Sequence, residues 1–80
     1  MATVFLPSGL TVYTGGIDTV QIDASRVMDL LEALAKRFPS LAPELEDVAV
    51  AVDGEIFQQP GYQPLSASSE VHLVPRVAGG

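Results

Sequence analysis

One segment of this 80-residue chain carries a helical period, and the segments around it carry the patterns of short strands. Its apolar residues recur at i, i+3, i+4, i+7 and i+11, which places them on one stripe of a helix. These residues are Val27, Leu30, Leu31, Leu34 and Phe38. A single amphipathic helix has to bury that stripe against another element of the same small chain, and a sheet is the partner that the other segments can provide.

The ends of this helix are marked by residues that favour helix termini. We expect Ser25 to cap its free amides, because a hydroxyl accepts hydrogen bonds from the first turn. Lys36 and Arg37 lie near the negative end of the helix dipole, and Pro39 cannot continue the hydrogen-bond ladder. The connection that follows, residues 40–47, is predicted to contain one irregular turn.

Five segments have the composition and alternation of strands, namely residues 3–6, 17–22, 48–52, 55–57 and 70–74. Gly15-Gly16 separates Leu10–Tyr13 from the second of these, which we interpret as the second strand of an amino-terminal hairpin. Asp53-Gly54 is the favoured two-residue turn for a second hairpin, and Pro75 ends the last strand.

The order of these elements predicts an α+β fold with a mixed sheet of four to five strands and one long helix packed on one face. Few residues follow the helix, so the last strand returns most economically beside the first, parallel to it and between the two hairpins. That arrangement is the β-grasp, and we expect residues 1–74 to form it as one domain.

Composition narrows the classes of partner. Apolar residues make up 48% of the chain against 18% charged, so it can collapse and fold alone. The net charge of −6 argues against nucleic acid or an anionic membrane and favours a basic protein surface. Residues 1–25 contain no Lys or Arg, and the longest apolar run is Val48–Val52, so we expect a soluble, cytoplasmic protein.

Catalytic and metal-binding patterns are missing from the sequence. The chain has no cysteine and a single histidine, His72, which we interpret as a histidine of the sheet surface. Nucleophilic triads and transition-metal sites need more than this, so we expect neither a metal nor a catalytic side chain, and the protein is not predicted to be an enzyme.

The end of the chain is its most specific feature. Residues 75–80 read Pro75-Arg76-Val77-Ala78-Gly79-Gly80, and two glycines fall at a given terminus by chance about once in two hundred sequences at ~7% glycine. Five residues beyond the proline reach ~16 Å when extended. We expect a flexible tail that can thread a narrow channel, because glycine lets other groups approach its backbone closely. A frayed terminus is the alternative.

The reacting group of such a tail is the carboxyl carbon of Gly80. A carboxylate is a poor electrophile, but joining it to AMP supplies a good leaving group. A sulfur nucleophile can then displace AMP and leave a thiocarboxylate, so a chain without cysteine can still carry sulfur.

Three motifs together resemble the ubiquitin-like sulfur carriers. They are the tail from Val74 to Gly80, the hairpin Ala51–Glu55, and the helix end Leu34–Pro39. This family includes the small subunit of molybdopterin synthase, the thiamine-biosynthesis sulfur carrier and the cysteine-biosynthesis sulfur carrier. The resemblance covers nearly the whole chain.

The resemblance implies a set of partners and site residues. The partners are an ATP-dependent activating enzyme, which uses Mg-ATP, a persulfide donor of the desulfurase or rhodanese type, and a sulfur-accepting synthase subunit; no cofactor is bound permanently. Gly80 is the adenylated and sulfur-carrying residue, and Gly79, Ala78, Val77 and Arg76 complete the reactive tail. Ile56 and Val74 sit where the family contacts its partners, although both can also be core residues.

The sequence departs from the family in three places. Ser68-Ser69-Glu70 replaces a Gly-Asp-Glu turn, which costs up to ~1 kcal/mol if the glycine position needs positive φ. Arg76 follows Pro75 where family tails often carry a second proline, so it is a candidate for partner specificity or a solvated charge. Leu10–Gly16, with the ending Val77–Gly80, looks more like carriers that feed cysteine synthesis.

Two other functions stay open. The same acyl-adenylate supports a protein modifier that is joined through Gly80 to lysines, and a β-grasp binding module can carry an incidental diglycine. In each case we expect the partner to bury an apolar patch on the sheet face away from the helix, ringed by acidic side chains that steer a basic partner.

Overall fold

The computed structural model describes residues 1–46, 48–57 and 62–75. Its strands, α-helix and 3₁₀ helices follow one another as β1 (Ala2–Phe5), η1 (Thr11–Tyr13), β2 (Thr19–Ile22), α1 (Val27–Arg37), η2 (Pro39–Glu46), β3 (Val48–Val52), β4 (Glu55–Phe57) and β5 (Glu70–Pro75). The predicted helix and all five predicted strands are confirmed, with bounds shifted by at most two residues.

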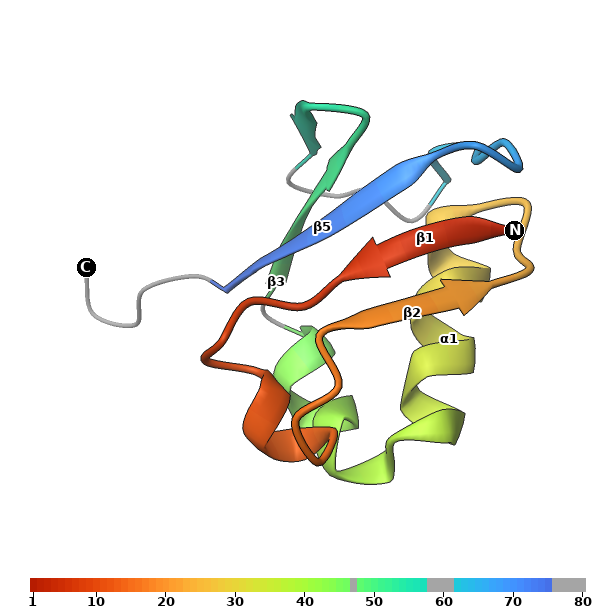
Figure 1. Ribbon diagram of the computed structural model, residues 1–80. Helices are drawn as coiled ribbons and strands as arrows, with labels where there is room; N and C mark the ends of the chain where they lie inside the picture. Colours follow the sequence, from red (N-terminus) through yellow and green to blue (C-terminus); the bar gives the residue numbers. More distant parts are fainter. Residues whose placement is uncertain (47, 58–61, 76–80) are drawn as a thin grey trace.

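The five strands form one mixed sheet in the order β2-β1-β5-β3-β4 (Figure 1). β5 runs parallel to β1, with Val4 opposite Val71, and antiparallel to β3, with Val50 opposite Leu73. The two hairpins therefore flank the last strand, as predicted. This is the β-grasp fold, and it makes the segment before the chain end the central strand of the sheet.

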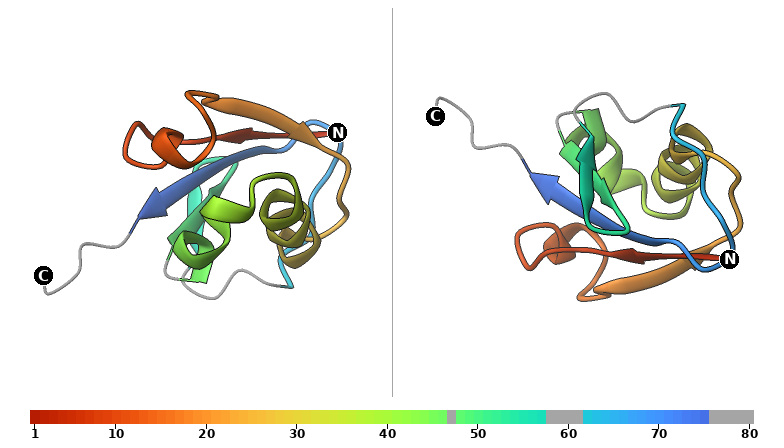
Figure 2. Two further views of the ribbon diagram at one scale, coloured as in Figure 1. Left: turned by 90° about the horizontal axis from the view of Figure 1, so that it is seen from below. Right: turned by 90° about the horizontal axis from the view of Figure 1, so that it is seen from above.

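The core lies between the sheet and the layer formed by α1 and η2 (Figure 2). Val27, Leu30 and Leu34 of α1 are fully buried, which confirms the stripe that the sequence predicts. Leu41 and Leu45 of η2 close the core beside the helix, so the proline-containing connection is a 3₁₀ helix with a buried face.

The start of α1 differs from the prediction. Arg26, in extended conformation, is the N-cap residue and makes no side-chain hydrogen bond to the helix, so the expected Ser25 cap is wrong. Instead, the Val27 amide donates to the Gln63 carbonyl at 3.0 Å, and the Leu65 amide donates to the Ser25 carbonyl at 2.8 Å. The free amide at the start of α1 therefore finds its acceptor on the backbone of the segment before β5, and not on the hydroxyl of a nearby serine.

The two hairpins use different connections. Asp53 and Gly54 both have positive φ, +50° and +87°, as a two-residue turn of type I′ requires, so the predicted turn between β3 and β4 is confirmed. β1 and β2 are instead joined by a longer loop that contains η1. It closes with the Leu6 amide donating to the Asp18 carbonyl, and β2 begins at Thr19 rather than at Ile17.

The serines before β5 fit their turn without strain. Neither Ser68 nor Ser69 has positive φ, so the cost considered for the missing glycine does not arise. Ser69 is 3% exposed, and its Oγ accepts a hydrogen bond from the Ser66 amide at 2.9 Å. A side-chain hydrogen bond therefore holds this turn.

Candidate functional site

The sheet topology fixes which parts of the chain lie beside the end of β5. Because β1 and β5 are parallel, the loop after β1 lies at the end of the sheet where β5 ends at Pro75. Pro75 is opposite Val48, so the connection from η2 into β3 reaches the same end. We call it the exit end. The tail residues Arg76, Val77, Ala78, Gly79 and Gly80 lie outside the described residues.

The sheet face away from α1, the outer face, carries the second candidate feature. Along β5, Val71 and Leu73 point into the core, so His72 and Val74 belong to the outer face. Along β3 the valines belong to the core cluster, and the alanines between them belong to the outer face. The alternation of Val and Ala in the sequence marks these two faces.

Ile56 and Val74 are exposed side chains of the outer face. Ile56 is 60% exposed and lies opposite Ala51, and Val74 is 38% exposed and lies opposite Ala49. These exposures rule out a core role for both residues. The small alanines between them leave the larger side chains standing above the sheet, and we call these four residues the docking surface.

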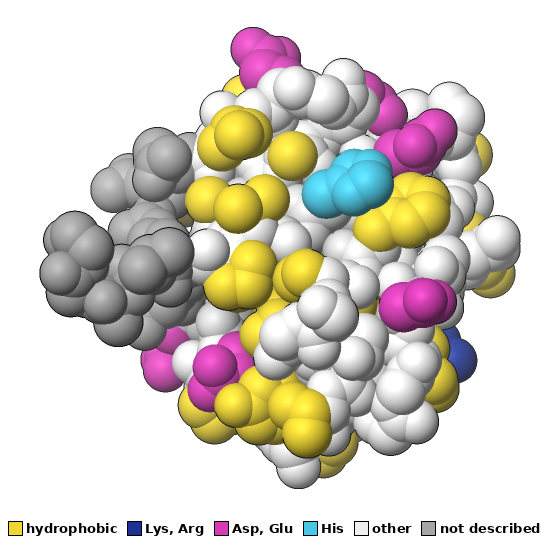
Figure 3. All heavy atoms as spheres, turned by 60° about the vertical axis from the view of Figure 1, so that its left-hand side comes forward, with side chains coloured by type: hydrophobic (Ala, Val, Ile, Leu, Met, Phe, Trp, Pro, Cys, Tyr) yellow, Lys and Arg dark blue, Asp and Glu magenta, His cyan; other side chains and the backbone are white. Residues whose placement is uncertain are grey.

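An aromatic pair borders the docking surface. The rings of Phe5 and His72 stack with centroids 4.5 Å apart and 12° between their planes, and His72 lies opposite Ala51. Figure 3 shows the histidine beside apolar side chains on this side of the molecule. The stack supports the interpretation of His72 as a residue of the sheet surface. It was not foreseen, because it depends on the register between two strands far apart in the sequence.

Acidic side chains stand at the margin of this apolar area (Figure 3). Asp53 and Glu55 belong to the β3–β4 hairpin, and Glu70 begins β5. Asp53 Oδ1 accepts a hydrogen bond from the Glu70 amide at 2.9 Å, which ties the hairpin turn to the start of the central strand. In the described part of the chain, the cationic side chains belong to α1 or its N-cap residue, on the other face of the sheet.

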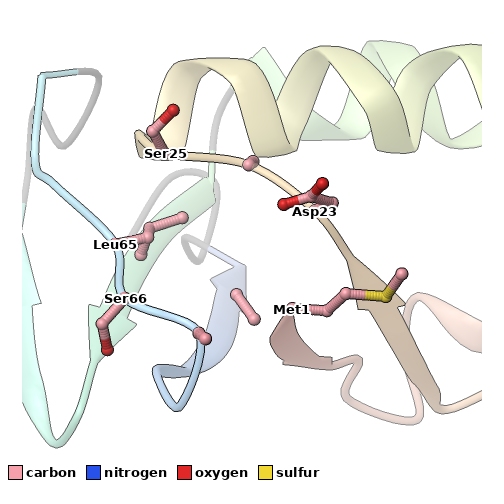
Figure 4. A pocket seen from close by; sticks show the side chains of 8 residues that line it. Met1, Asp23, Ser25, Leu65 and Ser66 are labelled. Carbon is pink, nitrogen blue, oxygen red and sulfur yellow. The ribbon is translucent and has the colours of Figure 1, made fainter.

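A shallow open pocket lies at the opposite end of the sheet from Pro75 (Figure 4). Its volume is about 230 Å³, and its lining includes Met1, Asp23, Ser25, Leu65 and Ser66. β5 starts near this pocket and runs away from it along its six residues, so the pocket and Pro75 lie at opposite ends of the strand.

Two further findings concern residues 1–46, 48–57 and 62–75. Within these ranges, His, Asp and Glu side chains do not gather in groups of three that could hold a metal ion. None of the helices found there is long and apolar enough to cross a membrane.

Comparison with known proteins agrees with this geometry. Among curated protein sequences, none matches the chain. A chain of the BexX/CysO complex of Amycolatopsis orientalis is 22% identical with a TM-score of 0.85, and 100% of each chain is covered. CysO of Mycobacterium tuberculosis is 20% identical with a TM-score of 0.84, covering 96% of this chain and 100% of that one. Both show the shared fold.

A third structure, SAMP1 of Haloferax volcanii, is 26% identical with a TM-score of 0.74, and the match covers 99% of this chain and 98% of that one. The model of the ThiS family matches residues 11–80, which include both the docking surface and the tail. The chain therefore belongs to the ThiS family of ubiquitin-like sulfur carriers.

Proposed function

We propose that this protein carries sulfur as a thiocarboxylate on Gly80. The observation that supports this most strongly is the position of β5, the central strand, which ends at Pro75, five residues before Gly80. The last two of these five residues are glycine. Five residues reach ~16 Å when extended, enough to enter the site of a separate enzyme.

The chemistry runs on the tail carboxylate and needs no catalytic side chain from this chain. The Gly80 carboxylate attacks the α-phosphorus of Mg-ATP, pyrophosphate leaves, and an acyl-adenylate forms on the activating enzyme. The sulfur of a protein persulfide, from a desulfurase or rhodanese, attacks the carbonyl carbon and AMP leaves. This leaves Gly80 joined to the donor protein through two sulfur atoms. A second thiol then attacks the sulfur that belongs to the donor's cysteine. The Gly80 thiocarboxylate is released, and a disulfide forms between the second thiol and the donor's cysteine.

The docking surface is proposed to hold the partners during these steps. Ile56 and Val74 offer apolar area that the fold leaves exposed, and the acidic margin favours a basic partner surface. Among the similar structures, the CysO of Amycolatopsis orientalis is described in a complex with BexX. A sulfur-accepting synthase subunit is the partner class that we propose for this chain, and the docking surface is available to it.

A protein modifier is the second candidate function. The similarity to SAMP1, a small archaeal modifier protein, favours it, because an acyl-adenylate on Gly80 can also be attacked by a lysine amine. In that reaction an amide bond forms, AMP leaves, and no sulfur is needed.

Intact-mass measurement separates the two functions. The chain is incubated with Mg-ATP, its activating enzyme and a persulfide donor, with and without other proteins. Exchange of one oxygen for one sulfur at Gly80 is the expected result, and lysine adducts without that exchange would favour the modifier. A variant lacking Gly79 and Gly80 is the control, which should keep the fold and lose both reactions. An unchanged mass in the wild-type chain with every component present contradicts both functions.

A further inference from the structure

An exposed valine lies on the loop that flanks the exit end. Val12, in η1, is 75% exposed, and Ile17, later in the same loop, is 43% exposed. The loop leaves β1 and enters β2 at the end of the sheet where β5 reaches Pro75. Figures 1 and 2 show η1 on the same side of the molecule as this end of β5.

Hydrogen bonds and buried residues hold this loop in one shape. Thr14 is 6% exposed, and its Oγ1 donates to the Ile17 carbonyl at 2.7 Å. The Gly16 amide donates to the Thr11 carbonyl at 2.9 Å, and Leu10 is buried in the core. Val12 is therefore presented to solvent at a fixed position, and a partner that contacts it has little ordering entropy to overcome.

The length of the tail sets how close a partner must come. Five residues after Pro75 reach at most ~16 Å, so an enzyme that holds Gly80 in its site has its surface close to the exit end. An acyl-adenylate also has to be kept from water, which requires the activating enzyme to enclose the carboxyl group. If the enzyme encloses so short a segment, the rim of its channel comes against the loop between β1 and β2 at the exit end.

We propose that Val12, supported by Ile17, is a specificity contact that packs on an apolar position at the rim of the activating enzyme's channel. This inference rests on the proposed function and adds to it a second contact, separate from the docking surface. Val12 makes no contribution to the chemistry of Gly80, so it affects the affinity for the carrier and leaves the rate of the bound complex unchanged.

The test is ATP–pyrophosphate exchange by the activating enzyme from the same source, measured against carrier concentration. Val12→Asp is expected to raise the KM for the carrier about tenfold with unchanged kcat, because a buried contact would be replaced by a charge. Tyr62→Ser is the matched control: Tyr62 is 78% exposed and adjoins Gln63, which contacts the start of α1 at the opposite end. Its KM should stay at the wild-type value.

Each outcome decides the inference. If the wild-type chain supports no exchange, the proposed function and this inference fall together. If it does and Val12→Asp has the wild-type KM, only the inference is overturned. The same holds if the variant fails only in delivering sulfur to an acceptor.

A photo-crosslinking residue at position 12 in the otherwise wild-type chain tests the contact without a charge that could disturb folding. A crosslink to the activating enzyme from position 12 and not from position 62 supports the contact, and its absence overturns it.

Discussion

β3 is buried on both faces, but its side chains are larger on one face than on the other. Val48, Val50 and Val52 fill the core beneath α1, whereas Ala49 and Ala51 lie on the outer face between larger, exposed side chains. On the core face, the valine side chains fill the space beneath the helix. On the outer face, the small alanine side chains leave Ile56 and Val74 accessible.

This contrast separates stability from recognition within a single strand. Core-face residues are enclosed by the helix layer, so shortening one leaves a cavity. On the outer face, Ile56 and Val74 meet solvent on one side, so changing them leaves the fold intact and alters what a partner meets. The predictions below test whether the two roles are as separate as the exposures indicate.

The largest effect is expected for Val50→Ala on the core face. Val50 is fully buried and lies opposite Phe57 and Leu73, so removing two methyl groups should lower the free energy of unfolding by about 2 kcal/mol. Urea denaturation measures this. Val74→Ala is the control on the outer face, because Val74 is 38% exposed, and it should change stability by less than about 0.5 kcal/mol. Equal losses at the two positions would break the contrast between the faces.

The next effect concerns binding. Ile56→Ala and Val74→Ala should each weaken the association with the activating enzyme about tenfold, because each removes exposed apolar area from the docking surface. Their melting temperatures should stay near that of the wild-type chain. Titration calorimetry gives the dissociation constants. Met28→Ala serves as the control, since Met28 is 43% exposed on α1, in the other layer. A loss of affinity as large for Met28→Ala as for the two docking variants would move the interface to the helix side.

Much of the fold could be predicted because its signals are local. The stripe from Val27 to Phe38 shows the helix, and Asp53-Gly54 shows the turn that starts the second hairpin. The strand order followed from the single helix and the few residues available after it. These features need only neighbouring residues and general rules of connection.

What could not be predicted depends on contacts between distant segments. The start of α1 is held by Gln63, thirty-six positions after Val27, so a nearby serine was mistaken for the cap. The Phe5–His72 stack likewise depends on the parallel register of β1 and β5. The exposure of Ile56 and Val74 was left open in the sequence because an apolar residue in a strand can face either side. The roles of the tail residues remain predictions.

The smallest expected effect is at the turn that sets which face Ile56 occupies. Gly54 has φ of +87°, a conformation that residues with a Cβ adopt with strain, so Gly54→Ala should cost about 1 kcal/mol of stability. A one-residue slip in the pairing of β3 with β4 would carry Ile56 from the outer face to the core face. Thermal unfolding measures the cost, and the affinity for the activating enzyme reports the register.

Gly9→Ala is the matched control for this turn. Gly9 has no positive φ, and a Cβ there would meet nothing within 4 Å, so its substitution should change stability by less than about 0.5 kcal/mol. If Gly54→Ala lowers stability but not the affinity for the activating enzyme, the turn is strained while the register of β3 and β4 is kept. The docking surface is then fixed by the sheet rather than by the turn. If affinity falls along with stability, the turn itself holds Ile56 on the outer face. An effect at Gly9 equal to that at Gly54 would contradict the role given to positive φ, because of these two glycines only Gly54 has a backbone that a Cβ strains.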